Sequence, residues 1–336
     1  MVNIMTHDWS EHRVLVTGAT GMVGSWLCED LLRRGAAVVA LVLDDDPHSR
    51  FYTDGIERGC AVVRGNLTDF SHCMRAMNAH ETDVVFHLGA QTVVGAALRD
   101  PLETFESNIR GTYNLLEAAR RLTPMVQALV VASSDKAYGD SNVLPYVETM
   151  PLNGKHPYDV SKSCTDLIAA TYAATYAMPV TIARCGNIFG GGDLNWSRIV
   201  PGTIRSLLAG KSPVLRSDGG HIRDYIYVRD VVDAYVRLGE ATLGRPELAG
   251  EAFNFSPESE CTVLELVAAV GAAMNLRAVP KILNTSTMEI QTQTLDATKA
   301  RVLLNWTASW SLAEALAETV RWYREHLPAT TAKALA

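Results

Sequence analysis

Short apolar runs alternate with stretches of helical spacing through the first half of the chain. The apolar runs cover 13–17, 37–43, 61–64, 83–88, 128–133 and 180–184. They are rich in β-branched residues and mostly lack alternating polar positions, which is typical of strands buried on both faces of a sheet. Helical spacing covers 22–34, 70–79, 102–121 and 158–176. This alternation predicts an α/β fold with a Rossmann-type, doubly wound parallel sheet.

The pattern loosens after residue 186. Residues 186–196 are rich in Gly and Asn and predict a loop, and a helix is predicted over 230–240. An apolar strand over 252–255 could return to the sheet, and the chain ends in a helix over 312–326. We expect a Rossmann domain over 11–185, to which 223–256 returns, and a smaller, mostly helical C-terminal lobe made of 186–222 and 257–326.

Composition narrows the class of protein. Of the 336 residues, 48% are hydrophobic and 20% are charged, as in ordinary globular proteins. The formal net charge of -7 argues against a nucleic-acid binder, because phosphate backbones select basic surfaces. The six cysteines include no C-x-x-C pair, so we expect buried free thiols and neither a metal site nor a disulfide framework. The chain shows no signal-peptide core and no apolar run of membrane-spanning length, which predicts a cytoplasmic protein without a membrane partner.

A glycine-rich turn follows the first predicted strand and opens the first helix. Its glycines, Gly18, Gly21 and Gly24, are spaced G-x-x-G-x-x-G. Such a turn lets backbone approach a pyrophosphate, and the helix N-terminus supplies N–H groups and a favourable dipole. Glycine turns also serve plain packing, but the position in the first strand–helix unit favours a dinucleotide site. We predict that this turn, including Met22 and Val23, binds the cofactor.

Acidic residues follow the second predicted strand, as Asp44-Asp45-Asp46. An acid about 20 residues past the glycines accepts hydrogen bonds from the adenosine ribose and repels a 2′-phosphate. Asp44 is therefore predicted to select NAD over NADP, although three consecutive aspartates would also suit a solvated loop. The predicted cofactor site is completed by residues that follow the third and fourth strands: Asn66, Leu67, Leu88, Gly89 and Ala90. The Rossmann domain is thus the predicted NAD-binding domain, and the C-terminal lobe is left to bind the substrate.

Two further segments carry candidate chemistry. Residues 133–139 (SSDKAYG) lie at the C-terminal end of the fifth predicted strand, and Tyr158 and Lys162 begin the next helix. Residues four apart share a helix face, and a nearby ammonium ion lowers the pKa of a phenol toward neutrality. Chance supplies Y-x-x-x-K on many surfaces, but here it follows a nucleotide-binding unit and serines at a strand end. This context predicts a catalytic site.

From Val14 to about His326 the chain resembles the extended short-chain dehydrogenase/reductases of the NAD-dependent epimerase/dehydratase type. Within that family it is most similar to the sugar-nucleotide 4,6-dehydratases, particularly the CDP-glucose 4,6-dehydratases. The similarity is carried by 18–27 (GATGMVGSWL), 87–91 (HLGAQ), 101–108 (PLETFESN), 134–136 (SDK), 186–193 (GNIFGGGD), 198–201 (RIVP) and 295–306 (LDATKARVLLNW).

The resemblance implies a lyase of deoxysugar biosynthesis that forms a 4-keto-6-deoxy sugar nucleotide. Tyr158 would take the proton from the sugar 4-hydroxyl while hydride leaves C4 for NAD. Lys162 would assist Tyr158 and hold the nicotinamide ribose, and Ser134 would hydrogen-bond the reacting oxygen. The 4-ketone acidifies H5, so water can be eliminated across C5 and C6 before the hydride returns to C6. Because the cofactor ends as it began, we expect tightly held NAD.

The pair Asp135-Lys136 distinguishes a dehydratase from its relatives. Elimination needs an acid for the 6-hydroxyl and a base for H5. Asp135 would be the acid if burial keeps it protonated. Lys136 would be the base only if desolvation or a nearby positive charge favours its neutral amine; otherwise it pairs with Asp135 or the substrate.

The substrate side is predicted less sharply. Arg223 is a candidate for the diphosphate because a guanidinium binds phosphate in a bidentate manner, and Asn187 and Arg198 are further candidates for substrate contact. Residues 223–228 (RDYIYV) have a form shared by many sugar-nucleotide enzymes, so the nucleotide and the hexose stay open.

Three further predictions concern the oligomeric state and the alternative functions. The resemblance implies a homodimer formed through the helices 102–121 and 158–176. A nucleotide-sugar 4-epimerase or a uronate decarboxylase on the same scaffold is the alternative function. A non-catalytic NAD-sensing protein is disfavoured by the intact Ser134, Tyr158 and Lys162.

Overall fold

The computed structural model describes residues 7–285 and 290–327. The chain divides into two compact units, which are described separately. Unit 1 consists of the described residues of Met1–Tyr138, Pro151–Arg184 and Val232–Phe253. Unit 2 consists of those of Gly139–Met150, Cys185–Val231 and Asn254–Ala336.

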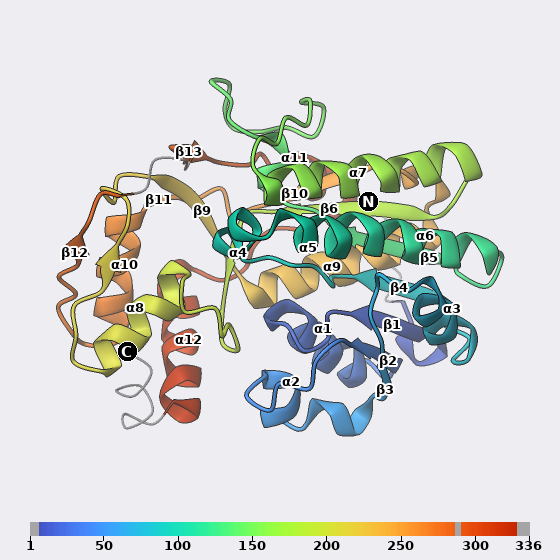
Figure 1. Ribbon diagram of the computed structural model, residues 1–336, viewed down its shortest axis with the longest axis horizontal. Helices are drawn as coiled ribbons and strands as arrows, with labels where there is room; N and C mark the ends of the chain where they lie inside the picture. The colour runs from blue at the N-terminus through green and yellow to red at the C-terminus, as the bar shows by residue number, and fades with distance from the viewer. Residues whose placement is uncertain (1–6, 286–289, 328–336) are drawn as a thin grey trace. The chain divides into compact units, whose positions relative to one another are not determined.

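Unit 1 is built on a seven-stranded sheet with the order β10-β6-β5-β4-β1-β2-β3 (Figure 1). The neighbours β3–β2, β2–β1, β1–β4, β4–β5 and β5–β6 all pair in parallel. The strands are β1 (Arg13–Thr17), β2 (Ala37–Val42), β3 (Ala61–Arg64), β4 (Val84–His87), β5 (Ala128–Ala132), β6 (Val180–Cys185) and β10 (Ala252–Phe255). The order reverses between β1 and β4, so the carboxyl ends of these two strands flank the switch point where open α/β sheets bind ligands.

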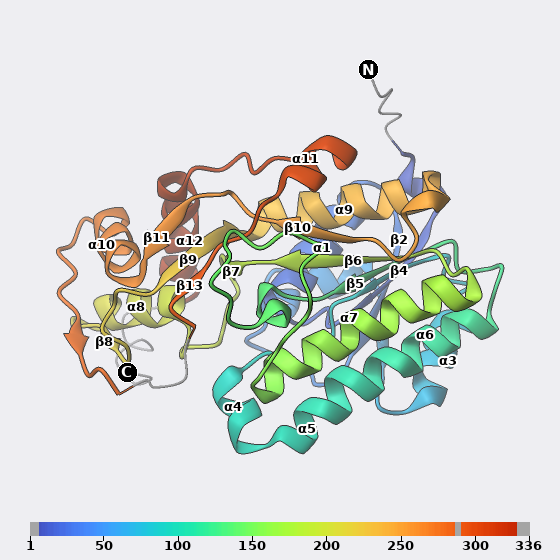
Figure 2. The same cartoon turned by 90° about the horizontal axis from the view of Figure 1, so that it is seen from above.

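Helices cover both faces of this sheet, which explains why its strands lack polar alternation. All four residues of β4 and all six of β6 are buried. Figure 2 shows α6 and α7 side by side on one face and α9 on the other. The helices of this region are α1 (Met22–Arg33), α2 (Arg50–Thr53), α3 (Phe70–Asn78), α4 (Val94–Arg99), α5 (Pro101–Phe105), α6 (Gly111–Arg121), α7 (Pro157–Tyr176) and α9 (Val228–Gly244), and the 3₁₀ turns are η1 (Trp9–Glu11), η2 (Ile56–Gly59), η4 (Asp135–Tyr138) and η5 (Pro246–Leu248).

The predicted helix over 102–121 is continuous, but its middle turn is π-helical. It consists of α5, a π-helical segment η3 (Glu106–Arg110) and α6. Asn108 lies within the π segment and is 1% exposed. Segments of this type are frequent at functional sites. The sequence pattern showed apolar spacing on both sides of the segment but not the extra residue that the π turn accommodates.

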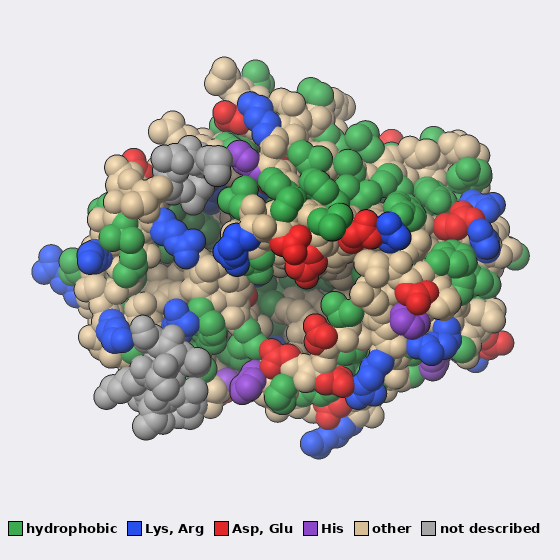
Figure 3. All heavy atoms as spheres, viewed as in Figure 1, with side chains coloured by type: hydrophobic (Ala, Val, Ile, Leu, Met, Phe, Trp, Pro, Cys, Tyr) green, Lys and Arg blue, Asp and Glu red, His purple; other side chains and the backbone are tan. Residues whose placement is uncertain are grey.

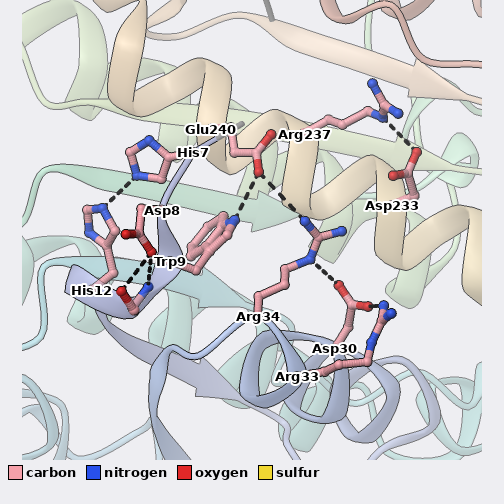
Figure 4. A network of polar contacts seen from close by, with 11 residues as sticks. His7, Asp8, Trp9, His12, Asp30, Arg33, Arg34, Asp233, Arg237 and Glu240 are labelled. Carbon is pink, nitrogen blue, oxygen red and sulfur yellow. Dashed lines mark hydrogen bonds and ion pairs between the residues drawn. The ribbon is translucent and has the colours of Figure 1, made fainter. Parts of the chain in front are cut away.

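Polar contacts link η1 to two helices of unit 1 (Figure 4). The indole of Trp9, which is 1% exposed, donates to Glu240 of α9 at 2.9 Å. Arg34 lies 3.9 Å from Glu240 and donates to Asp30 of α1 at 2.6 Å. This network joins η1, α1 and α9.

Unit 2 has β9 (Ile222–Tyr227) at its centre. β11 (Glu260–Thr262) pairs with it antiparallel, while β13 (Thr292–Gln293) and β7 (Asn187–Phe189) pair with it in parallel at its start and end. β8 (Val214–Leu215) pairs with β12 (Lys281–Ile282). The helices are α8 (Ile199–Leu208), α10 (Val263–Ala273), α11 (Thr298–Leu304) and α12 (Leu312–His326). The lobe predicted as mostly helical therefore also contains short strands.

The units divide the chain differently from the predicted domains. Residues 139–150 belong to unit 2, and only 232–253 of the predicted returning segment 223–256 lie in unit 1. The reason is that β9 finds its backbone partners in β7, β11 and β13 and not in the parallel sheet. All six cysteines are free thiols, four of them buried. Within 7–285 and 290–327, no helix is long and apolar enough to cross a membrane.

Candidate active site

The glycine-rich turn leaves no room for a side chain at Gly18 or Gly24. Gly18 adopts φ +69°, and a Cβ there would lie 2.9 Å from the Cα of Gly89. A Cβ on Gly24 would lie 2.1 Å from the carbonyl oxygen of Gly18. Gly21 is the N-cap of α1 and offers no side-chain oxygen to its first-turn N–H groups. Such N–H groups suit a pyrophosphate, so the turn fits a dinucleotide cofactor.

The other predicted cofactor residues follow the strands next to β1. Asp44 is exposed just after β2, and Asn66 and Leu67 follow β3. Leu88, Gly89 and Ala90 follow β4. The carboxyl ends of parallel strands meet at one edge of a sheet, so the structure brings all these residues to the same edge as the glycine turn. Their contacts with a cofactor stay predictions.

The catalytic candidates lie where β5 ends and α7 begins. Ser134 and Asp135 are 8% and 3% exposed, and the Ser134 hydroxyl donates to the Asp135 carboxylate at 2.9 Å. Lys136 is half-buried in η4, which packs against α7. The hydroxyl of Ser163 donates at 3.0 Å both to the carbonyl of Ala137 and to that of Asp159, which joins η4 to the first turns of α7.

Lys162 and Tyr158 occupy one face of α7, four residues apart. Lys162 is 4% exposed and its ammonium donates to the carbonyl of Ala132 at 2.8 Å, which directs it toward the end of β5. Tyr158 is half-buried on the second residue of the helix. Farther along, the buried Asp166 of α7 accepts two hydrogen bonds from Arg184 of β6, at 2.7 and 2.8 Å, and these fix the helix on the sheet.

A chain of buried hydrogen bonds runs through His87 of β4 and connects β1, β4 and α6 near the carboxyl ends of the strands. The Leu88 and Gly89 N–H groups donate to the Thr17 hydroxyl oxygen, which lies 2.9 Å from Nδ1 of His87. Nε2 of His87 lies 3.0 Å from the Thr112 hydroxyl, which donates to the carbonyl of Asn108. Burial, together with the nearby charge of Lys162, lowers the pKa of His87 to about 3. The imidazole is therefore neutral and structural.

Asn108 is a site residue that the sequence reasoning missed. Its amide donates to the carbonyl of Gln91 at 3.0 Å and to the Ser161 hydroxyl at 2.9 Å, and Ser161 donates to the carbonyl of Tyr158. Asn108 therefore connects the loop after β4 with the backbone of the predicted catalytic tyrosine. Two polar residues four apart on the buried face of a helix, Asn108 and Thr112, were the available signal.

Asp159, the neighbour of Tyr158, was also missed. It is 5% exposed and is the third residue of α7. Burial raises the pKa of this carboxyl, and the charge of Lys136 opposes the rise. From the sequence alone, an acid within the Y-x-x-x-K motif is indistinguishable from an ordinary exposed helix residue. Only its burial and the proximity of Lys136 in the structure distinguish it.

The predicted substrate residues all lie in unit 2. Arg223 of β9 is 6% exposed and donates to the backbone carbonyls of Ile222 and Gln291, at 2.7 and 3.0 Å, and to that of Ile290. Arg198, the N-cap of α8, pairs with Asp193 at 3.0 Å. Asn187 of β7 has a buried amide nitrogen that lacks a partner among the described residues. The structure thus gives Arg223 an anchoring role in its lobe, and all three substrate roles stay predictions.

Taken together, the residues of unit 1 can perform acid–base chemistry beside a dinucleotide. A phenol, an ammonium and a hydroxyl suffice to take a proton from an alcohol as its carbon is oxidised. The carboxylate of Asp135 and the ammonium of Lys136 add two groups capable of proton transfer next to them.

Comparisons with known proteins agree with this chemistry. Residues 14–254 match the sequence profile of the NAD dependent epimerase/dehydratase family. The chain is 28% identical over 330 residues to the CDP-glucose 4,6-dehydratase of Salmonella typhimurium, covering 94% of this chain and 91% of that one. It is 31% identical over 321 residues to a UDP-glucose 4-epimerase of Mycolicibacterium smegmatis, covering 93% and 98%.

A solved structure with the same fold belongs to a dehydratase. The dTDP-glucose 4,6-dehydratase DesIV of Streptomyces venezuelae, with NAD and TYD bound, superposes with a TM-score of 0.81 at 26% identity. The alignment covers 93% of this chain and 97% of DesIV.

Proposed function

Because the chain belongs to the NAD-dependent epimerase/dehydratase family, we propose that it is a nucleoside-diphosphate-hexose 4,6-dehydratase, similar to the CDP-glucose enzymes. The observation that carries this proposal is the Asp135–Lys136 pair beside Ser134. Oxidation at C4 requires only Ser134, Tyr158 and Lys162. The pair supplies the two further proton-transfer groups that elimination of water demands.

The first step uses the residues at the start of α7. Tyr158 takes the proton from the sugar 4-hydroxyl, and Ser134 hydrogen-bonds the same oxygen. Lys162 stabilises the phenolate form of Tyr158, since an ammonium ion favours a nearby anion. NAD, held at the glycine turn, would supply the hydride chemistry: it would accept hydride from C4 and would be its source at C6.

The second step uses the neighbouring pair. The 4-ketone acidifies H5, so a base removes this proton while an acid protonates the 6-hydroxyl and water departs. Asp135 and Lys136 are the two groups that η4 offers for these roles. The product is a 4-keto-6-deoxy sugar nucleotide. On the substrate side, Arg223 would contact the diphosphate through its remaining N–H groups, and Asn187 and Arg198 would contact the rest of the substrate.

The alternative is a 4-epimerase or a uronate decarboxylase, which need the same fold and cofactor. The 31% identity to a UDP-glucose 4-epimerase favours the epimerase among these. Neither reaction requires an acid–base pair for C5 and C6. A non-catalytic NAD-sensing protein would have no need of the buried Lys162 held at the end of β5.

The proposed function is tested by mass spectrometry of the purified protein incubated with CDP-, dTDP-, UDP- and GDP-hexoses, with and without NAD. We expect one of the four to lose one water. An unchanged mass together with a new epimer would replace the dehydratase by the 4-epimerase, and loss of carbon dioxide from a uronate would replace it by the decarboxylase.

Substitution of Tyr158 by Phe should abolish turnover. General acid–base groups contribute roughly 10²- to 10⁴-fold, so we expect a loss at least that large, with NAD binding retained. Turnover is followed by the same mass measurement, and NAD binding by calorimetry. Tyr176→Phe is the matched control, because Tyr176 ends the same helix and is 53% exposed. Persistent turnover in Tyr158→Phe would contradict the first step.

We further propose that the protein forms a homodimer through α4 to α7. Hydrophobic side chains gather over these helices in Figure 3. The most exposed of them are Leu102 and Leu167, at 68% and 57%. Val94, Leu98 and Tyr113 extend the same surface and are 38–44% exposed. Contiguous apolar surface of this kind marks interaction sites.

A further inference from the structure

The loop between β2 and α2 is tied to the glycine turn. The hydroxyl of Ser49, which is 3% exposed, donates to the backbone carbonyl of Thr20 at 2.6 Å. The Ser49 N–H donates to the carbonyl of Asp46 at 3.0 Å, and the Asp46 carboxylate accepts the N–H of His48 at 2.9 Å. These bonds hold the acidic residues that follow β2 at the same edge of the sheet as the turn that is predicted to bind the pyrophosphate.

Asp45 of this loop binds an arginine of the neighbouring strand. Nε of Arg64 donates to one carboxylate oxygen of Asp45 at 2.8 Å, and the Tyr52 hydroxyl donates to the other at 2.5 Å. Arg64 is the last residue of β3 and pairs in register with Val42, the last residue of β2. The ion pair therefore bridges the carboxyl ends of these two strands.

Arg50 and Arg64 differ in what they can offer a ligand. Arg50 of α2 is 4% exposed, donates to Glu29 at 2.6 Å and lies over the ring of Trp26. The Arg64 side chain is 67% exposed. A guanidinium binds phosphate in a bidentate manner, and an exposed ion pair contributes little stability of its own. Asp45 thus occupies an arginine that would otherwise suit a phosphate.

The adenosine ribose distinguishes the two nicotinamide cofactors. NAD has a 2′-hydroxyl that an acid after the second strand binds, whereas NADP has a 2′-phosphate that a nearby arginine accommodates. We propose that Asp45 is a specificity-determining residue: by occupying Arg64 it keeps the guanidinium from a 2′-phosphate, and it reinforces the selection of NAD by Asp44. The proposal depends on the cofactor site at the glycine turn and not on the reaction, because an epimerase or a decarboxylase of this family would bind the same cofactor.

A competition between the two cofactors tests this role. The purified protein is dialysed against a mixture of NAD and NADP without a sugar nucleotide, and the bound nucleotides are released and quantified by chromatography. The ionic strength is kept low, because salt screens exposed charges. Asp45→Ala releases Arg64, so the ratio of bound NADP to bound NAD should rise by at least about tenfold, the low end for hydrogen bonds to charged groups. The total of bound nucleotide should stay at the wild-type level, which shows that the variant is folded.

Two further variants separate a role of Arg64 from a change of net charge. Asp46→Ala is the matched control, since Asp46 is the next residue, its side chain is 51% exposed against 47% for Asp45, and its carboxylate binds His48. Its ratio should change by less than about threefold, as for an ordinary surface substitution. The Asp45→Ala, Arg64→Gln double variant should return to the wild-type ratio. An unchanged ratio in Asp45→Ala, an equal rise in Asp46→Ala, or a rise that survives Arg64→Gln would overturn the proposal.

This outcome is distinguishable from failure of the proposed function. Bound nucleotide is measured without a sugar nucleotide, so a protein that removes no water from any of the four nucleotide hexoses still gives a ratio. The ratio decides the role of Asp45, and the mass of the product decides the reaction.

Discussion

Gly24 shows how closely a single position is constrained at the cofactor turn. A Cβ there would lie 2.1 Å from the oxygen and 2.8 Å from the carbon of the Gly18 carbonyl, both of them backbone atoms that cannot swing away. Gly24→Ala must therefore displace the turn. Overpacking of this kind costs about 1–3 kcal/mol, so NAD affinity should fall by roughly 5- to 150-fold.

The measurement for Gly24→Ala is calorimetric titration with NAD. Gly244→Ala serves as the control, because a Cβ at that end of α9 has no neighbour within 4 Å. NAD affinity in Gly24→Ala equal to that of the wild-type protein would show that the turn is not the pyrophosphate site.

At the scale of elements, the His87 chain joins β1, β4 and α6, and it carries a pH signature. The pKa of His87 is about 3 in the fold and near 6.5 in the unfolded chain. The unfolded state therefore binds more protons between these values, and the free energy of unfolding falls as pH drops through this range. The contribution is complete above about pH 6.5, and roughly 2 kcal/mol of it should be lost between pH 7 and pH 5.

Urea unfolding at pH 7 and pH 5 tests this assignment. His87→Gln can still donate and accept within the chain but cannot titrate, so its stability should depend less on pH, by the same 2 kcal/mol or so. His48→Gln is the control, because the side chain of His48 is 85% exposed. An equal pH dependence in wild type and His87→Gln would mean that His87 is protonated in the fold.

The elements of unit 1 were predictable because each is defined by local pattern. β1 and β3 span the predicted residues, and the strand predicted over 252–255 is β10. Apolar β-branched runs buried on both faces leave little choice of register or face. The π segment at Asn108 could not be predicted from the sequence, because one additional residue in a turn does not alter the apolar spacing around it.

Unit 2 was less predictable for the opposite reason. Its central strand, β9, pairs with residues 187–189, 260–262 and 292–293, which are far away in sequence and mostly only two or three residues long. Such strands have no periodicity to detect. The site residues divide in the same way. Ser134, Tyr158 and Lys162 belong to local sequence motifs. Asp159 and Asn108 can be recognised only from their burial and from the neighbours that the fold brings to them.

At the scale of the whole molecule, the exposed apolar surface over α4 to α7 predicts that the chain forms a homodimer through it. A single exposed leucine is common on protein surfaces, but Leu102 and Leu167 lie on two helices that pack against each other, α5 and α7. A stable protein–protein interface buries about 800 Å² on each partner, which the exposed face of several helices can supply. A lysine in the middle of such an interface would bury an unpaired charge, whereas on a free surface it costs little.

Sedimentation should therefore show a dimer for the wild-type protein and a monomer for the Leu102→Lys, Leu167→Lys double variant. Val302→Lys, which changes an equally exposed residue at 68%, should remain a dimer. A monomeric wild-type protein would contradict the prediction, and a double variant that stays dimeric would place the interface elsewhere on the chain.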